Sequence, residues 1–130
     1  MRYGLILVFF TALLTAAPAE WARDYGEARQ IAAQEGKIVY LLITAPGCRW
    51  CKRFKRTTLK DKAVRSRLGA MAVGVEVERD SGSYPAAFKA PMIPMHYFLS
   101  ADERVLVKMP GYWNIEDFMS ILDDVERKRK

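Results

Sequence analysis

Cys48 and Cys51 are the only cysteines of the chain, and they stand three residues apart in the stretch A-P-G-C-R-W-C-K-R. Such a pair can form a structural disulfide, supply two ligands of a metal site, or exchange electrons as a reactive dithiol. A disulfide between them would constrain the unfolded chain little, because the stabilisation grows with the length of the closed loop. A structural zinc site usually needs four ligands, and this motif supplies two. The spacing therefore favours a reactive pair.

The residues around the pair predict that Cys48 opens a helix. Pro46 and Gly47 end the preceding β-prone run, and a helix then follows. Unpaired backbone amides and the positive end of the helix dipole favour a thiolate at that position. Five basic side chains follow within two turns and add to this effect: Arg49, Lys52, Arg53, Lys55 and Arg56. We therefore expect a pKa of Cys48 below the ordinary value of about 8.5, with Cys48 attacking and Cys51, nearly one turn later, resolving.

The N-terminus indicates export. Met1-Arg2 is followed by an apolar run from about Gly4 to Ala17 and then by the small-residue sequence Ala17-Pro18-Ala19. A basic start, a short hydrophobic stretch and such a site are typical of a secretory signal peptide, and the run is shorter than the roughly 18 residues of a membrane-spanning helix. We expect a signal peptide over residues 1–19, a single domain over 20–130, and a periplasmic location, where paired cysteines are able to oxidise.

The chain is moderately basic, with a formal net charge of +6 over 130 residues. Its basic residues gather in 52–56 and 127–130, without a separate aromatic platform or a nucleic-acid motif. We expect a solvated face and a basic tail, and no nucleic-acid partner.

Hydrophobic patterning predicts the elements that position the cysteines, in the order helix, strand, helix, strand, short helix, strand, strand, helix. The expected strands are 38–43, 71–77, 95–99 and 104–108; the expected helices are 21–35, 48–68 with an interruption near Thr57-Thr58, 84–89, and a last one capped by Asn114. The pattern predicts a mixed sheet with helices on both faces.

Four features in this order and spacing resemble the thioredoxin fold. They are the first helix followed by Lys37 just before the strand, Cys48-Arg49-Trp50-Cys51, Ile93-Pro94, and Gly111-Tyr112. The chain resembles the small exported thioredoxin-related proteins over roughly residues 21–125. The resemblance implies an α/β thioredoxin-like fold, with a central mixed four-stranded sheet flanked by helices on both faces. It also implies thiol–disulfide exchange that needs no prosthetic group, because the electrons reside in the Cys48–Cys51 disulfide.

The resemblance further implies roles for residues outside the pair. Pro94 corresponds to a cis proline that faces the cysteine turn and exposes the backbone of Ile93 to an extended substrate. Arg49 and Trp50 stand where thioredoxin has Gly-Pro, and would tune the redox potential and offer a contact surface. The buried acid of thioredoxin's central strand falls at Leu42, so Glu76 on the neighbouring strand is the candidate proton relay. A solvent-facing carboxylate is the alternative interpretation of Glu76.

Two other functions compete with exchange. A copper-binding protein, or one that maintains the thiols of a copper site, could use the two cysteines with three further soft or imidazole ligands, namely Met92, Met95 and His96. Core packing is the alternative interpretation of Met92, Met95 and His96, because methionines fill gaps in a core and successive residues of a strand point to opposite faces. A redox-silent binding module with the same fold is the second alternative.

As the main hypothesis, we expect a thiol–disulfide oxidoreductase of the bacterial cell envelope. It would act as a monomer on protein thiols or disulfides, with a membrane redox partner. Reductase, oxidase and isomerase share this chemistry, and the sequence leaves the choice among them open.

Overall fold

The computed structural model describes residues 21–130, and the signal peptide expected over 1–19 lies outside them. Four strands form one sheet in the order β2-β1-β3-β4. Their bounds are β1 Ile38–Thr44, β2 Ala72–Glu78, β3 Met95–Leu99 and β4 Val105–Pro110. β1 pairs parallel with β2 and antiparallel with β3, and β3 pairs antiparallel with β4. The mixed four-stranded sheet expected from the sequence is confirmed.

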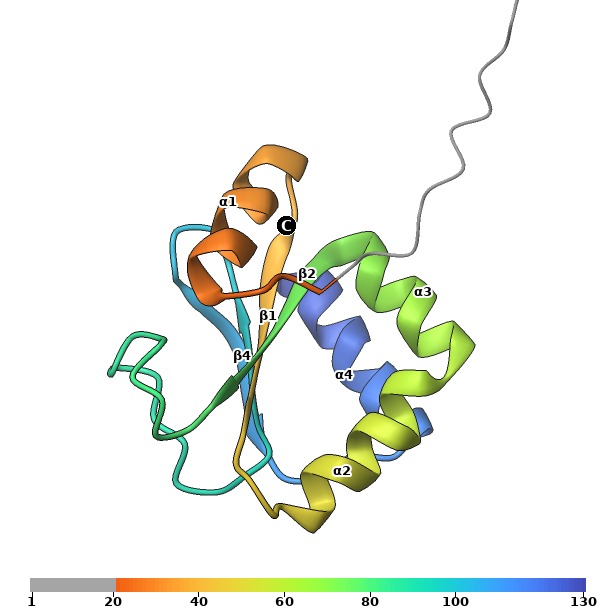
Figure 1. Cartoon of the computed structure of the whole chain (residues 1–130). Coiled ribbons are helices and arrows are strands. Elements are labelled where there is room, and N and C mark those ends of the chain that lie inside the picture. Colours follow the sequence, from red (N-terminus) through yellow and green to blue (C-terminus); the bar gives the residue numbers. More distant parts are fainter. Residues whose placement is uncertain (1–20) are drawn as a thin grey trace, which may run out of the picture.

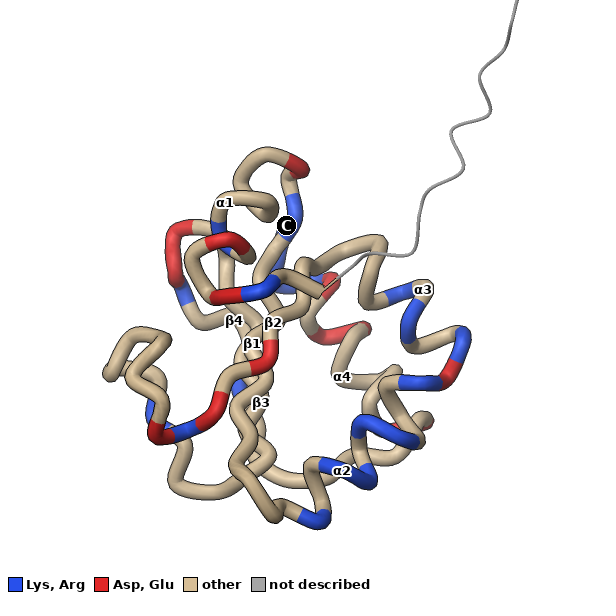
Figure 2. Tube along the Cα trace, in the orientation of Figure 1, with Lys and Arg blue, Asp and Glu red and all other residues tan. Residues whose placement is uncertain are grey.

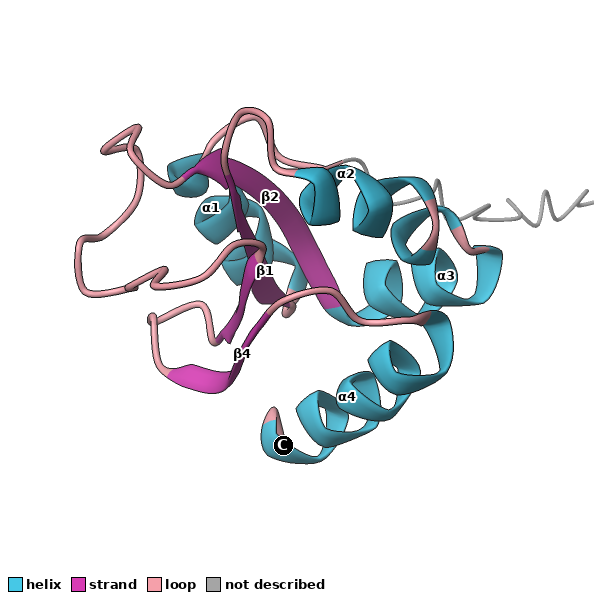
Figure 3. Ribbon diagram, turned by 90° about the horizontal axis from the view of Figure 1, so that it is seen from below, coloured by secondary structure: helices cyan, strands magenta, loops and turns pink. Residues whose placement is uncertain are grey.

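Helices cover both faces of this sheet (Figure 1). They are α1 Tyr25–Glu35, α2 Arg49–Arg56, α3 Lys62–Met71 and α4 Ile115–Lys128, with a short 3-10 turn, η1 Thr58–Lys60, between α2 and α3. α1 lies on one face, whereas α2, α3 and α4 lie on the other, as the view from below also shows (Figure 3). None of the helices within residues 21–130 is long and apolar enough to cross a membrane.

β1 is one of the two central strands, and all seven of its residues are buried, as expected of a strand covered on both faces. Its alternating side chains divide the interior into two clusters. The cluster under α1 contains Val39, Leu41 and Ile43, and the cluster under α2, α3 and α4 contains Tyr40 and Leu42 with Phe54 and Phe118. The sheet is thus a rigid support with α2, and hence the cysteines, at one end.

The helix bounds differ from the predicted ones where side chains cap the backbone. α1 begins after Asp24, whose carboxylate accepts a hydrogen bond from the Glu27 amide at 2.8 Å. The residues before it run along the sheet instead, and the Ala22 amide donates to the Gly74 carbonyl at 2.8 Å. The interruption expected near Thr57-Thr58 is confirmed, and Asp61 caps α3 by accepting from the Val64 amide at 3.0 Å.

The short helix predicted over residues 84–89 is wrong, because this segment is a loop with a single turn. The Phe88 amide donates to the Pro85 carbonyl at 3.1 Å, and no helical ladder follows within the segment. One turn is too short to repay the entropic cost of starting a helix. The Phe88 side chain instead packs against Tyr25 and Tyr97, with ring centroids 6.3 and 5.3 Å away. The loop thereby covers the face of the sheet next to α1.

Candidate active site

The cysteine turn joins the end of β1 to the start of α2. Gly47 has φ +74°, a conformation that glycine adopts without a steric penalty, and it turns the chain into the helix. Cys48 is the N-cap of α2, and its sulfur accepts a hydrogen bond from the Cys51 amide at 3.1 Å. The two cysteines form a disulfide with their Cα atoms 5.3 Å apart. Cys48 therefore stands at the positive end of α2, as the sequence predicted.

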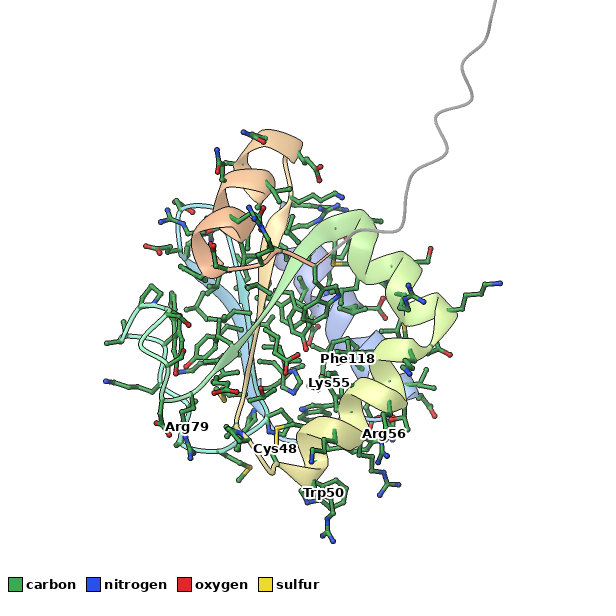
Figure 4. All side chains as sticks on the ribbon, in the orientation of Figure 1. Cys48, Trp50, Lys55, Arg56, Arg79 and Phe118 are labelled. Atoms are coloured by element: carbon green, nitrogen blue, oxygen red, sulfur yellow. A yellow bond between two sulfur atoms is a disulfide. The ribbon has the colours of Figure 1, made fainter. Side chains whose placement is uncertain are left out.

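The two sulfurs differ in access. Cys48 is half-buried, whereas the Cys51 residue is only 2% exposed. In Figure 4 Cys48 lies where β1 meets α2, and the neighbouring Trp50 points away from the body of the molecule. An incoming sulfur can therefore reach Cys48, while Cys51 is covered by the protein.

α2 is strongly basic, since five of its eight residues are Arg or Lys. Figure 2 shows basic residues along α2 and α3 on the same side of the molecule. Within residues 21–130, Lys55 is the one basic residue of α2 with an acidic partner: its Nζ lies 2.8 Å from Oε1 of Glu76. Arg49, Lys52, Arg53 and Arg56 form no ion pair with any residue of the described part of the chain. Their positive charge is therefore not neutralised by an ion pair along α2.

The loop before β3 lies at the same end of the sheet. The Ile93–Pro94 peptide bond is cis, in line with the sequence expectation. Met95, the next residue, pairs with Ile43, one residue before β1 ends. The Pro94 carbonyl accepts a hydrogen bond from the Gly111 amide at 2.7 Å. This register brings Ile93 and Pro94 to the sheet end that carries the cysteine turn.

Two arginines and two aromatic rings form a surface that we name the arginine–aromatic ledge, consisting of Arg49, Trp50, Arg53 and Tyr112. The rings of Trp50 and Tyr112 lie 5.7 Å apart between centroids. The Arg53 guanidinium lies over both, 5.4 Å from Trp50 and 5.2 Å from Tyr112, and that of Arg49 lies 5.6 Å from Trp50. The sequence singled out Arg49 and Trp50. It gave no local signal for the contact of Arg53 with Tyr112, which is remote in the chain.

Glu76 lies in an open depression of about 390 Å³ beside the cysteine turn. The lining comprises residues 44–48, Cys51, Lys52, Lys55, Glu76, Val77 and Glu78. Oε1 of Glu76 accepts hydrogen bonds from Thr44 Oγ1 at 3.0 Å and from Lys55 Nζ at 2.8 Å, and its side chain is 34% exposed. Leu42, the position of thioredoxin's acid, is buried and pairs with Glu76 across the sheet. Glu76 thus shares an opening with both cysteines; its link to Lys55 was not foreseen.

Two of the residues suggested as copper ligands, Met95 and His96, lie in the core of the protein. His96 is buried, its Nε2 donates to the Gly111 carbonyl at 2.7 Å, and its Nδ1 therefore accepts from the Tyr40 hydroxyl at 2.7 Å. Met95 belongs to the cluster under α1, on the opposite face of β3. No group of three or more His, Cys, Asp or Glu side chains in residues 21–130 is arranged to hold a metal ion.

Burial lowers the pKa of His96 to about 4, although its hydrogen bond to Gly111 acts in the opposite direction. His96 is therefore neutral near pH 7. It joins Tyr40 in the core to the loop that carries Tyr112, and so helps to fix one side of the site.

Comparison with known proteins identifies the family. The family model described as Thioredoxin-like domain matches residues 25–126. No curated protein matches the chain. A thioredoxin from Thermus thermophilus shares 22% identity at a TM-score of 0.75, covering 87% of this chain and 91% of that one.

Two further solved structures are similar. The DsbH oxidoreductase shares 20% identity at a TM-score of 0.68, with 95% of each chain covered. The periplasmic thioredoxin SoxS from Paracoccus pantotrophus shares 15% identity at a TM-score of 0.61, and the match covers 72% of this chain and all of that one. Similarity at these identities shows the fold, and the family match extends over most of the chain. The chain therefore belongs to the thioredoxin-like domain family and carries the Cys-X-X-Cys pair of a thiol–disulfide oxidoreductase.

Proposed function

We propose that the protein is a thiol–disulfide oxidoreductase of the bacterial cell envelope that exchanges disulfides with protein substrates through Cys48 and Cys51. The observation that carries this proposal is the disulfide at the N-terminus of α2, with one accessible and one covered cysteine. A purely structural disulfide would not need one accessible and one covered cysteine, and a disulfide that closes so short a loop would stabilise the fold little.

The exchange proceeds in two displacement steps. In the reduced protein, the Cys48 thiolate attacks a substrate disulfide, forms a Cys48–substrate mixed disulfide, and expels the second substrate sulfur as a thiolate. Cys51 then loses its proton and attacks the Cys48 sulfur. This closes the Cys48–Cys51 disulfide and releases the first substrate sulfur, so that two electrons pass to the substrate. Oxidation of a substrate dithiol follows the same steps in reverse.

The surroundings of the pair support both steps. The amides and dipole of α2, with the free basic side chains around it, stabilise the Cys48 thiolate. Ile93 and Pro94 supply backbone for an extended substrate at the same sheet end, and Arg49 and Trp50 tune the potential. Glu76, which shares the depression with Cys51, accepts the proton that Cys51 must lose.

The location and partners follow from the N-terminal sequence and the chemistry. Export by the signal peptide would bring the protein to an oxidising compartment, and the similar SoxS is itself periplasmic. There a monomer would act on protein thiols or disulfides, and a membrane redox partner would restore its working state.

Equilibration of the purified protein with buffers of reduced and oxidised glutathione tests the exchange. We expect the pair to pass reversibly between dithiol and disulfide, and Cys48→Ser to abolish exchange with a disulfide-bonded protein. A pair that stayed oxidised in all of these buffers would be a structural disulfide, and the proposal would be wrong. Alkylation trapping in cells then gives the direction, because a mostly reduced pair indicates a reductase and a mostly oxidised pair an oxidase.

A further inference from the structure

We propose that the arginine–aromatic ledge selects protein partners whose reacting cysteine is flanked by Asp or Glu. This inference rests on the proposed exchange at Cys48 and names the class of substrate that the site prefers. The ledge begins next to Cys48 in the chain, because Arg49 and Trp50 directly follow this N-cap residue at the start of α2.

The Arg53 side chain lies against two aromatic neighbours. Its guanidinium lies over the rings of Trp50 and Tyr112, and a stacked guanidinium keeps its N–H groups at the edge of its plane. The Tyr112 hydroxyl lies 3.4 Å from Thr57 Oγ1, which in turn donates to the Arg53 carbonyl at 2.7 Å. The ledge is therefore tied to the end of α2 as well as to its start. A fork of donors held in this way matches a carboxylate, which can accept two hydrogen bonds at once.

The charge of the ledge has no counterpart in residues 21–130. Arg29, Arg67 and Arg127 each pair with an acidic side chain, whereas Arg49 and Arg53 pair with none. Both side chains are exposed. Complementary charge on a partner would satisfy these groups on docking and would raise the rate of encounter.

An acidic protein segment fits this surface better than other anions. Trp50 is 44% exposed and Met92, next to Ile93, is 56% exposed, so apolar area lies beside the cations. A peptide that reaches Cys48 brings both a backbone and side chains to that area. A nucleic acid could also stack on Trp50 and pair with Arg53, but it offers no sulfur for Cys48, and the experiment distinguishes the two.

Three peptides test the proposal, each with one cysteine bound as a mixed disulfide to thionitrobenzoate. They differ only in the residues flanking the cysteine, which are acidic, neutral or basic. The reduced protein attacks the peptide sulfur and releases the coloured thiolate, and Cys51 then closes the disulfide and releases the peptide thiol. The readout is the ratio of second-order rate constants for the acidic and the basic peptide. This ratio cancels any change in Cys48 reactivity that affects all peptides equally.

We expect the acidic peptide to react roughly tenfold faster than the basic one at low ionic strength, with most of the difference lost at about 0.5 M salt. Arg53→Glu should remove or invert the preference. Arg53→Lys should keep part of it, because a lysine retains the charge without the planar fork. Arg65→Glu is the matched control, since Arg65 is an exposed arginine on α3 without an ion partner in the described chain, and it should change the ratio less than twofold.

The outcomes separate the two proposals. If no peptide releases the thiolate, the exchange itself is wrong. If all three react at similar rates, or Arg53→Glu and Arg65→Glu act alike, exchange stands and the selective role of the ledge is overturned. Stronger inhibition by a single-stranded oligonucleotide than by a cysteine-free acidic peptide would assign the ledge to nucleic acid and overturn the proposal as well.

Discussion

At the scale of single residues, the proposed exchange requires Cys51 to lose a proton, and we propose that Glu76 accepts it in place of the acid of thioredoxin's central strand. Leu42 fills that position with an apolar side chain. Glu76 lies beside it on β2, held by Thr44 and Lys55. Because Glu76 is about one-third exposed, water and Lys55 screen it, and its effect on the chemistry should be smaller than that of a buried acid.

Glu76→Gln should therefore slow the resolving step by roughly tenfold, below the ~10²–10⁴ typical of general acid–base catalysis, and should flatten the pH dependence of that step. Rapid mixing of the reduced protein with a mixed-disulfide peptide measures it. Glu78→Gln is the control, since Glu78 lines the same depression and loses the same charge. An unchanged pH profile for Glu76→Gln would show that Glu76 is a solvent-facing carboxylate that takes no part in proton transfer.

His96 makes a separate prediction about pH and stability. Its pKa is about 4 in the folded protein, against 6.5 as the ordinary value. The unfolded chain thus takes up a proton between these values while the folded protein does not. The contribution of neutral His96 to the free energy of unfolding is fully present above pH 6.5. It decreases as the pH drops toward 4, by roughly 3 kcal/mol at most.

Denaturant unfolding at pH 7 and pH 4.5 measures this effect, with His96→Gln as the comparison. Glutamine can still donate to Gly111 and accept from Tyr40, but it does not titrate. The wild type should lose about 2 kcal/mol more than His96→Gln over this interval. Equal losses would show that His96 is not the source of the acid sensitivity.

At the scale of elements, the segment before α1 acts as a cover on β2. A Cβ atom at Gly74 would lie 2.8 Å from two ring atoms of Trp21, and the Trp21 ring packs edge-on against Tyr40 with centroids 5.8 Å apart. Gly74 thus lets the indole approach the sheet, and the hydrogen bond from Ala22 holds the segment there.

Gly74→Ala should lower the free energy of unfolding by about 1–3 kcal/mol, because it overpacks this contact. Gly26→Ala in α1 is the matched control and should be neutral or stabilising. In a Trp21→Ala background the penalty of Gly74→Ala should largely vanish. A penalty of the same size in both backgrounds would place its cause elsewhere than in the Trp21 contact.

The same scale shows what the sequence could and could not predict. Continuous or alternating apolar runs identified all four strands, because the buried positions of a strand are occupied by apolar residues. The cysteine turn, Pro94 and the Asn114 cap carry local signals, and each was placed correctly. The 84–89 loop was misjudged because Phe88 is fixed by partners on α1 and β3. The contacts Arg53–Tyr112 and Lys55–Glu76 were missed because they join distant elements.

At the scale of the whole molecule, the fold brings three separate segments to one end of the sheet. The cysteine turn follows β1, the cis-proline loop precedes β3, and the Gly111–Tyr112 loop follows β4. One hydrogen bond, from the Gly111 amide to the Pro94 carbonyl, joins the second and third segments. The contact of Trp50 with Tyr112 joins the third segment to α2. We propose that these three parts act together on one substrate sulfur, with Cys48 attacking and Cys51 resolving.

Trapping of the mixed disulfide tests this claim most directly. Reduced Cys51→Ala and Cys48→Ala variants are each mixed with a disulfide-bonded protein, quenched with acid, and analysed by mass spectrometry. We predict that Cys51→Ala accumulates an adduct linked through Cys48, whereas Cys48→Ala accumulates none. Adduct formation through Cys51 at a comparable rate, or no adduct with either variant, would contradict the account.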